Sequence, residues 1–353
     1  MNKSIIFIFI SLYFTLWNNT YSQNLSDVNQ SIPVSNLFKS QEILPLKLNY
    51  SNKDLKKKTN DSTYLKTSLS YKTENDTWNV IDIEIRKRGN FRLKNCYYAP
   101  VKIKIKKSKS KGTLFEGNKK LKLVLPCLTN KSKNDYIVKE YMAYKLFEII
   151  SPYHFNTRLV AISYEEINGK KIKIHNIKGI LIEDDKKIAK RHEGDILKRS
   201  INPLNHDPIS SVYNAFFQFM IGCTDFSTAF QHNQKLLFVD KKIIPIPYDF
   251  DVSGLVNPSY AMSSGEKSEN LGLTSVTQRL YRGFKRNPAI IQQVREEFLN
   301  NKNALIEIVD SLNPYFDDPK EFLKAKNYIL DFFEVMESNE RFNNEITSKL
   351  RTK

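Results

Sequence analysis

The chain contains few cysteines and lacks the short motifs that mark several common enzyme classes. Its three cysteines, Cys96, Cys127 and Cys223, are an odd and sparse set, and none belongs to a CxxC pair of the kind that holds zinc. At most one disulfide can form, and we expect all three side chains to be buried as small apolar groups. Internal repeats and P-loop, GxSxG, HExxH and GxGxxG motifs are also missing. The sequence therefore gives no sign of the sites that these motifs build.

A long apolar run occurs only at the N-terminus. The first residues have a basic start at Lys3, an apolar run from Ile5 to Trp17, and small or polar residues Thr20 and Ser22 placed for cleavage before residue 23. This pattern is typical of a secretory signal peptide covering residues 1–22, because the run is too short for a comfortable transmembrane helix. An uncleaved anchor is the alternative. We expect export to the periplasm, the cell surface or the medium, with no transmembrane segment after signal removal.

Acidic residues are in the minority. Lys and Arg number 55 and Asp and Glu 38, which gives a formal net charge of +17. Such a charge attracts nucleic acid, anionic lipid, acidic polysaccharide or nucleotide phosphates. The excess is spread over the whole chain, however, so we predict neither a dedicated polyanion surface nor a nucleic-acid partner. The length suffices for two compact lobes or one large domain.

Alternating apolar and polar residues dominate the first half of the chain, after a polar stretch at residues 23–43 that we interpret as a linker. The alternation predicts half-buried strands, with a solvated loop at residues 51–63. An Asn-Gly pair at residues 168–169, between two further alternating runs, indicates a hairpin. The strands before it are expected at residues 44–50, 68–71, 78–91, 100–107 and 119–126.

Helical periods appear at residues 135–152 and dominate the second half. Residues 212–223, VYNAFFQFMIGC, are apolar on all sides and predict a buried helix. Amphipathic helices are expected at residues 274–284, 288–312 and 318–338. Arg279, Arg282 and Arg286 would lie along one helix flank, either solvated or as a phosphate rim.

Candidate metal ligands lie at both ends of one predicted β-hairpin, within residues 224–257. Two apolar runs are separated by the polar turn at residues 240–242, and such a turn brings the two ends of a hairpin together. Carboxylate and amide oxygens that converge in this way suit Mg²⁺ or Mn²⁺. The alternative is that these residues only form turns and caps. The ligands are Asp225, His232 and Asn233 before the hairpin and Asp249 and Asp251 after it.

Basic residues in the first half are candidates for binding an anion. Residues 86–92, RKRGNFR, place Arg88 in a glycine turn where backbone N–H groups and Arg side chains can meet an anion. A plain basic hairpin tip is the alternative. Lys102, Lys104 and Lys106 share one face of a predicted strand, where one of them would hold phosphates and the others would be solvated.

Acidic residues in the same half are less specific. Glu140 on the first long helix is either solvated or directed at a strand lysine. Glu183, Asp184 and Asp185 end a strand as an acidic cluster. Their alternative role is to cap the helix that begins KKIAKRH.

These parts, in this order, resemble the spore coat protein kinase family, CotH, in the variant common among secreted proteins of Bacteroidetes. The resemblance covers about residues 81–260. It rests on RKRGNFR, the strand lysines Lys102 and Lys104, the helix with Lys139-Glu140, GILIEDD with Glu183, TDFSTAFQHN and above all PYDFDVSG.

The resemblance implies an α+β, atypical protein-kinase-like fold with two lobes, a sheet-rich one at residues 44–185 and a mainly helical one at residues 186–353. It implies transfer of the γ-phosphoryl group of ATP to Ser of a secreted or envelope protein, with Mg²⁺ or Mn²⁺. Asp225 would lie near the attacking hydroxyl or bind a second metal, Asp249 would bind the metal with support from Asp251, and Asn233 would bind the metal or order water.

The remaining roles implied by the resemblance concern ATP. Lys102 or Lys104 would hold the α- and β-phosphates, Glu140 would orient that lysine, and Glu183 would lie near the adenine. Arg88 and its neighbours would add positive charge above the phosphates.

The sequence departs from ordinary kinases at several points. Asn233 follows Asp225 by eight positions, where kinases have about five, and neither a preceding His-Arg nor a Gly-rich loop is present. Two other hypotheses therefore stand beside the kinase. One is a catalytically degenerate envelope module that binds an anionic ligand, and the other is a metal-dependent hydrolase of phosphodiesters.

Overall fold

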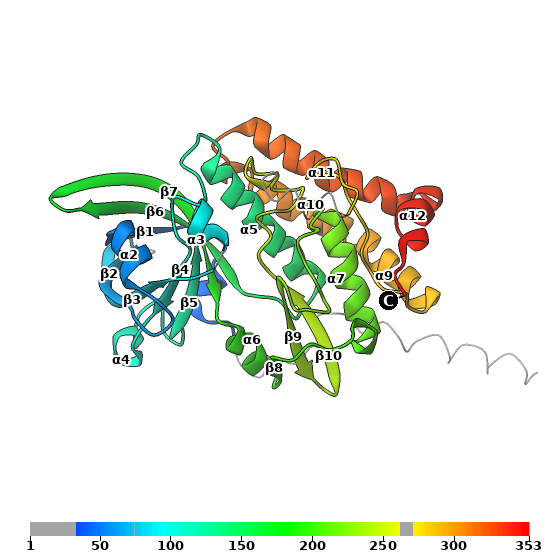
Figure 1. The fold of residues 1–353 in the computed structure, drawn as a ribbon, viewed down its shortest axis with the longest axis horizontal. Coiled ribbons are helices and arrows are strands. Elements are labelled where there is room, and N and C mark those ends of the chain that lie inside the picture. Colours follow the sequence, from blue (N-terminus) through cyan, green and yellow to red (C-terminus); the bar gives the residue numbers. More distant parts are fainter. Residues whose placement is uncertain (1–32, 74, 90, 262–270, 353) are drawn as a thin grey trace, which may run out of the picture.

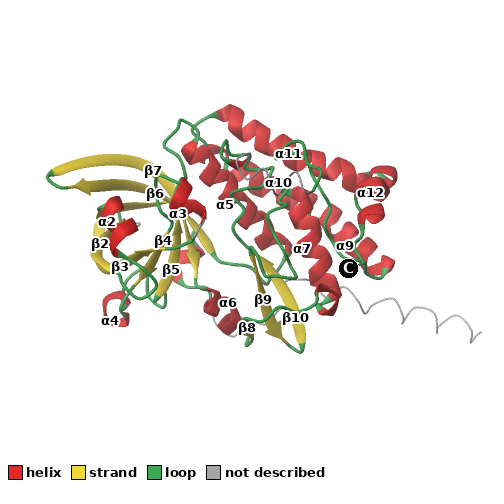
Figure 2. Cartoon of the chain, viewed as in Figure 1, coloured by secondary structure: helices red, strands yellow, loops and turns green. Residues whose placement is uncertain are grey.

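The computed structural model describes residues 33–73, 75–89, 91–261 and 271–352 (Figure 1). The predicted signal peptide and the first part of the predicted linker lie outside these residues. Within the described part of the chain, none of the helices combines the length and apolar character that crossing a membrane requires. The strands of the first half and the helices of the second occupy opposite sides of the molecule (Figure 2).

The first half folds into a closed barrel in the order β1-β2-β3-β4-β5-β7-β6. Adjacent strands are antiparallel except β1 and β6, whose parallel pairing from Leu44↔Val160 to Tyr50↔Glu166 closes the barrel. The side chains of Ile81, Ile83 and Ile85 point inward with the other members of an apolar core. The strands are β1 (Leu44–Tyr50), β2 (Leu65–Lys72), β3 (Trp78–Lys87), β4 (Val101–Lys104), β5 (Lys120–Val124), β6 (Thr157–Asn168) and β7 (Lys171–Glu183).

This barrel shows that the predicted kinase-like two-lobed fold is wrong, and only the mixed α+β content is confirmed. Alternation in a strand reports which face is buried but not which strand lies beside each edge. The parallel pairing of β1 with β6 joins residues more than a hundred positions apart. It satisfies the backbone groups of both edge strands, which an open sheet would leave exposed.

The second half is built on helices around a separate apolar core. Helix α7 is buried on all sides, as predicted, and α5 lies against β6 and β7. One predicted helix at residues 288–312 is divided into two at Asn301. The long helices are α5 (Lys133–Ile150), α7 (Pro208–Met220), α9 (Pro288–Asn300), α10 (Lys302–Ser311) and α11 (Pro319–Glu337). The short ones are α1 (Asn36–Lys39), α2 (Asn52–Lys58), α3 (Phe91–Asn95), α4 (Lys107–Ser110), α6 (Asp185–Arg191) and α12 (Asn339–Glu345), with 3-10 turns at Pro203–Asn205, Asn313–Tyr315 and Thr347–Lys349.

Both predicted hairpins are confirmed. Strands β9 (Gln234–Val239) and β10 (Lys242–Pro247) pair with each other, and the other edge of β9 pairs with β8 (Asp195–Leu197), in a small antiparallel sheet. Asp240 and Lys241 both have positive φ, 48° and 61°, which is the backbone of a tight turn that matches strand twist. The Asn168–Gly169 turn joins β6 to β7, whose tip extends past the rest of the barrel (Figure 1).

Three local expectations are wrong. The predicted loop at residues 51–63 contains α2, capped by Ser51, and Leu37 and Phe38 of the predicted linker are buried in the barrel core. Residues 274–284 are irregular chain rather than helix. Their arginines bind carbonyl oxygens: Arg279 those of Phe219, Met220 and Tyr328, Arg282 those of Thr224 and Phe226, and Arg286 those of Pro203 and Leu204.

All three cysteines are buried, as predicted, but two of them are cross-linked. Cys96, just after α3, forms a disulfide with Cys127, just after β5, and Cys223 keeps a free thiol. Burial raises the pKa of that thiol above its usual range, so it is not a reactive group.

Candidate functional site

The loop after α7 brings Asp225, His232 and Asn233 together. The Asn233 side-chain amide donates to the Asp225 carbonyl at 2.7 Å and to the Asp225 carboxylate at 3.2 Å. The His232 ring lies 3.2 Å from the same carboxylate. Arg282 binds the carbonyl oxygens of Thr224 and Phe226 at 2.5 and 2.9 Å, so it holds the backbone on both sides of Asp225.

The hairpin β9–β10 delivers the second group of acids beside this loop. The Tyr248 N–H donates to the Asn233 carbonyl at 3.1 Å, which joins the two ends as predicted. Asp249 has a positive φ of 66°, and its N–H donates to the hydroxyl of Tyr144 on α5 at 3.0 Å. Positive φ is uncommon among residues other than glycine, and Asp is one of the few that adopt it readily, so an aspartate suits this position.

Asp251 lies deeper, in a buried cluster of charges. Its carboxylate is 3.8 Å from Arg92 Nε of α3 and accepts a hydrogen bond from Tyr260 at 3.3 Å. Burial raises the pKa of Asp251 to about 6, Arg92 opposes that shift, and Asp249 adds to it. Arg92 also donates to the Leu125 carbonyl at the end of β5 at 2.5 Å. The guanidinium thus connects the barrel with the acidic group.

Glu140 completes the acidic group from α5. It is only 1 % exposed, and its Oε1 has no hydrogen-bond partner among the described residues. Burial raises the pKa of Glu140 well above its usual value, Asp251 and Asp249 raise it further, and Arg92 lowers it. A buried carboxylate oxygen without a hydrogen-bond donor is costly, which makes Glu140 a candidate functional residue.

A group of basic side chains lies near the ring of Tyr248. The amine of Lys122 on β5 is 4.8 Å from the centre of the Phe155 ring and 5.0 Å from that of Tyr248, and Lys235 is 5.6 Å from the Tyr248 ring. Burial lowers the pKa of Lys122 to about 8, and the nearby charges of Arg88 and Lys235 lower it further. No ion pair or hydrogen bond joins Lys122 to any described residue. It is therefore a cation available to an anionic ligand.

The two predicted phosphate lysines, Lys102 and Lys104, both lie near acidic side chains. Lys102 is the neighbour of Lys122 across β4 and β5, and its amine lies 3.8 Å from Asp184. Lys104 forms an ion pair of 2.7 Å with Glu84 on the outer face of the barrel. Lys122 contacts the ring of Tyr248, the residue before Asp249, and the cation that acts most strongly on Glu140 is Arg92.

Glu183 and Asp184 have structural contacts. The Glu183 carboxylate receives Arg191 at 2.9 and 3.0 Å and the Asn156 backbone N–H at 2.9 Å. Asp184 is the N-cap of α6. Helix capping was the alternative role that the sequence analysis gave for this acidic cluster. Asp185 lies 3.9 Å from Lys235, at the border of the basic group.

The acidic group can hold a metal ion only with additional ligands. Among the described residues, no three His, Cys, Asp or Glu side chains are grouped as a metal site. Mg²⁺ commonly takes one or two carboxylates and completes its shell with water and substrate phosphates. Asn233 already contacts Asp225 and Asp251 contacts Arg92 and Tyr260, so a metal ion at Asp249 would need water and a bound phosphate to complete its shell.

Sequence reasoning missed Lys122, Lys235 and Arg92 as parts of the site. The alternation of residues 119–126 placed Lys122 on a strand face but did not show that Lys102 is its cross-strand neighbour. Arg92 lies in the basic turn that was singled out, but its partner Asp251 is 159 positions away (251 − 92). Only the folded chain brings these two residues together.

Binding of an anionic ligand is expected to weaken as pH rises through 8. The folded-state pKa of Lys122 is lowered to about 8, so its charge is present below that pH and is lost above it. Affinity for sulfate, whose own charge is constant between about pH 7 and about pH 9, should fall by up to about tenfold per pH unit in the upper part of this range when measured by calorimetry. The Lys122→Met variant should bind weakly with a flat profile, and an unchanged slope would remove Lys122 from the site.

No protein-family model matches the chain, and a search of curated proteins finds no significant match.

Proposed function

We propose that this protein binds ATP with Mg²⁺ or Mn²⁺ and transfers the γ-phosphoryl group to Ser of an exported protein. One observation carries the proposal: the amine of Lys122 lies 5.0 Å from the centre of the Tyr248 ring, and the next residue, Asp249, is close enough for its charge to raise the pKa of Tyr248. A phosphate chain with a divalent metal needs cations on one side and carboxylates on the other.

Phosphoryl transfer requires this combination because its transition state is stabilised by position and charge rather than by covalent chemistry. Lys122 and Arg88 would neutralise phosphate oxygens. Asp249 and Asn233 would hold the metal ion. Asp225, which has contacts to both His232 and Asn233, would lie near the attacking hydroxyl.

The proposal rests on the site and on the motif resemblance, and the barrel architecture lends it no support. The export part of the proposal has one independent support, the Cys96–Cys127 disulfide, because disulfides persist mainly in oxidising compartments. The N-terminal signal sequence remains a prediction.

A second candidate is a binding module for an anionic ligand that has no catalytic activity. The basic group favours it, because Lys122, Arg88 and Lys235 could bind an anion without any metal. The two candidates differ in the role of Asp249. The phosphotransferase needs its carboxylate to hold the metal ion, and the binding module does not need it.

The test compares two aspartates of the same hairpin. Asp249→Asn removes the charge but keeps a residue type that tolerates positive φ. Asp240→Asn is the matched control, since Asp240 also has positive φ, 48°, and lies in the exposed turn. With ATP and Mg²⁺ at about 100 times Kd, the wild type should gain about 2.7 kcal/mol of stability in a thermal-shift titration.

The Asp249→Asn variant should lose the metal-dependent part of that gain and the transfer of labelled phosphate to itself or to an added Ser-rich protein. The Asp240→Asn variant should keep both. Undiminished transfer by Asp249→Asn contradicts the phosphotransferase. Binding of pyrophosphate that is independent of metal and unaffected by Asp249→Asn, with no transfer, identifies the second candidate.

A further inference from the structure

Lysines continue from the candidate site along the outer face of the barrel. Val101, Ile103 and Ile105 point into the barrel core, so the residues that alternate with them, Lys102, Lys104 and Lys106, point outward. The hydrogen bond from the Ile105 N–H to the Lys119 carbonyl continues the pairing of β4 with β5 as far as Lys106.

Strand register places two more lysines on the same face. Lys102 pairs with Lys122, and Lys104 pairs with Lys120. Cross-strand partners share one face of a sheet, so these four side chains form a compact basic array. With Lys106 we call this array the lysine track. One of its ends is Lys122 in the candidate site, and the other is Lys106.

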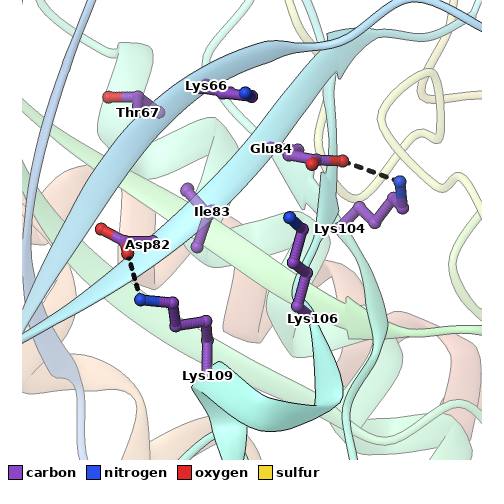
Figure 3. A pocket seen from close by; sticks show the side chains of 8 residues that line it. All are labelled: Lys66, Thr67, Asp82, Ile83, Glu84, Lys104, Lys106 and Lys109. Carbon is purple, nitrogen blue, oxygen red and sulfur yellow. Dashed lines mark hydrogen bonds and ion pairs between the residues drawn. The ribbon is translucent and has the colours of Figure 1, made fainter.

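The track ends in a hollow of about 390 Å³ between β2, β3 and the segment after β4 (Figure 3). Lys104 is paired there with Glu84 at 2.7 Å and Lys109 with Asp82 at 2.8 Å. These pairs neutralise both carboxylates of the hollow. Lys66 and Lys106 have no ion pair with any described residue, so the hollow keeps an excess of positive charge.

We infer that the lysine track and its hollow bind an extended acidic segment of the acceptor protein; this inference rests on the proposed function. Lysines on alternate positions of a strand repeat every two residues, about 7 Å. An extended peptide presents alternate side chains with the same repeat, so its carboxylates reach Lys106 directly and compete with Asp184 and Glu84 for Lys102 and Lys104. Because the track ends at Lys122, a segment bound along it leads directly into the candidate site.

The lysines without partners provide the clearest test. In Lys66→Glu/Lys106→Glu the charge of the hollow is reversed, while Lys102, Lys104 and Lys122 stay intact. The matched control is Lys171→Glu/Lys173→Glu, which makes the same change at two exposed strand positions near the tip of the β6–β7 hairpin. The probe is a fluorescent peptide of alternating Glu and Ser, titrated by anisotropy without nucleotide or metal into the chain that begins at residue 23.

The hollow variant should bind the peptide about tenfold more weakly than the wild type, and the control by less than about twofold. An equal loss in both variants would mean that net charge alone attracts the peptide, which overturns the inference. Tighter binding of a sulfated oligosaccharide through Lys66 and Lys106 would also overturn it, in favour of a polysaccharide.

Two further measurements keep the result interpretable. If the Glu variant unfolds by circular dichroism, Lys66→Gln/Lys106→Gln removes the charges without reversing them, and the same loss of peptide binding is expected. The ATP and Mg²⁺ thermal shift should be unchanged in the hollow variant. If the wild type shows the thermal shift but does not bind the peptide, the inference about the lysine track is wrong and the proposed function stands. If the wild type shows no thermal shift with ATP and Mg²⁺, the proposed function is wrong.

Discussion

Replacing Arg92 with methionine is expected to lower the free energy of unfolding by about 3–5 kcal/mol at about pH 8. Arg92 is 8 % exposed and is the cation nearest to Asp251, at 3.8 Å. Burial already raises the pKa of Asp251 to about 6 and that of Glu140 well above its usual value. Without Arg92, the folded chain must either bury an uncompensated carboxylate or take up a proton from solution.

The sign of the pH dependence follows from these shifts. An acid with a raised folded-state pKa stabilises the fold below its unfolded pKa and loses that contribution as pH rises through the folded value. Loss of Arg92 raises the pKa of Asp251 further. The deficit of Arg92→Met should therefore be small at about pH 5, where Asp251 is largely protonated in both proteins, and large at about pH 8.

Urea unfolding at both pH values measures the two deficits. The control is Arg341→Met, which removes an exposed arginine paired with Glu334 and Glu345 and should cost less than about 1 kcal/mol at either pH. Adding Asp251→Asn to Arg92→Met should restore part of the stability at high pH. A deficit of the same size at both pH values would show that Arg92 acts through packing and not through charge.

The sequence predicted local structure well where one residue type fixes the backbone. The Asn168–Gly169 turn was correct because an Asn-Gly pair favours a tight hairpin turn, and the turn at residues 240–242 was correct because polar residues there separate two apolar runs. The hairpin β9–β10 then placed Asn233 beside Tyr248. The convergence of both acidic groups was thus predictable from one turn.

Prediction from sequence patterns failed where the structure of a segment depends on residues far away in the sequence. Residues 274–284 have a helical period, yet Arg279 and Arg282 bind carbonyl oxygens at and beyond the end of α7, which holds the segment in an irregular path. The closure of the barrel and the position of Lys122 beside Lys102 likewise depend on register between strands. No local pattern encodes these pairings.

Removing the disulfide is the second change with a large expected effect. Cys96 and Cys127 are 31 positions apart, and opening a loop of that length should lower the free energy of unfolding by about 3–4 kcal/mol. The Cys96→Ala/Cys127→Ala variant is compared with the wild type by urea unfolding with and without reductant. Reductant should destabilise the wild type and leave the variant unchanged.

The disulfide should also affect the site, because it fixes the segment that carries Arg92. Between the two half-cystines the Tyr97 N–H donates to the Cys127 carbonyl at 2.8 Å, and Arg92 binds the Leu125 carbonyl two positions before Cys127. Without the cross-link, α3 loses its covalent attachment to the end of β5, so the Arg92 charge should be less firmly placed over Asp251. We therefore expect the variant to show a weaker thermal shift with ATP and Mg²⁺ even at temperatures where circular dichroism finds it fully folded. A variant that loses stability but keeps the full thermal shift would show that the disulfide does not affect ligand binding at the site.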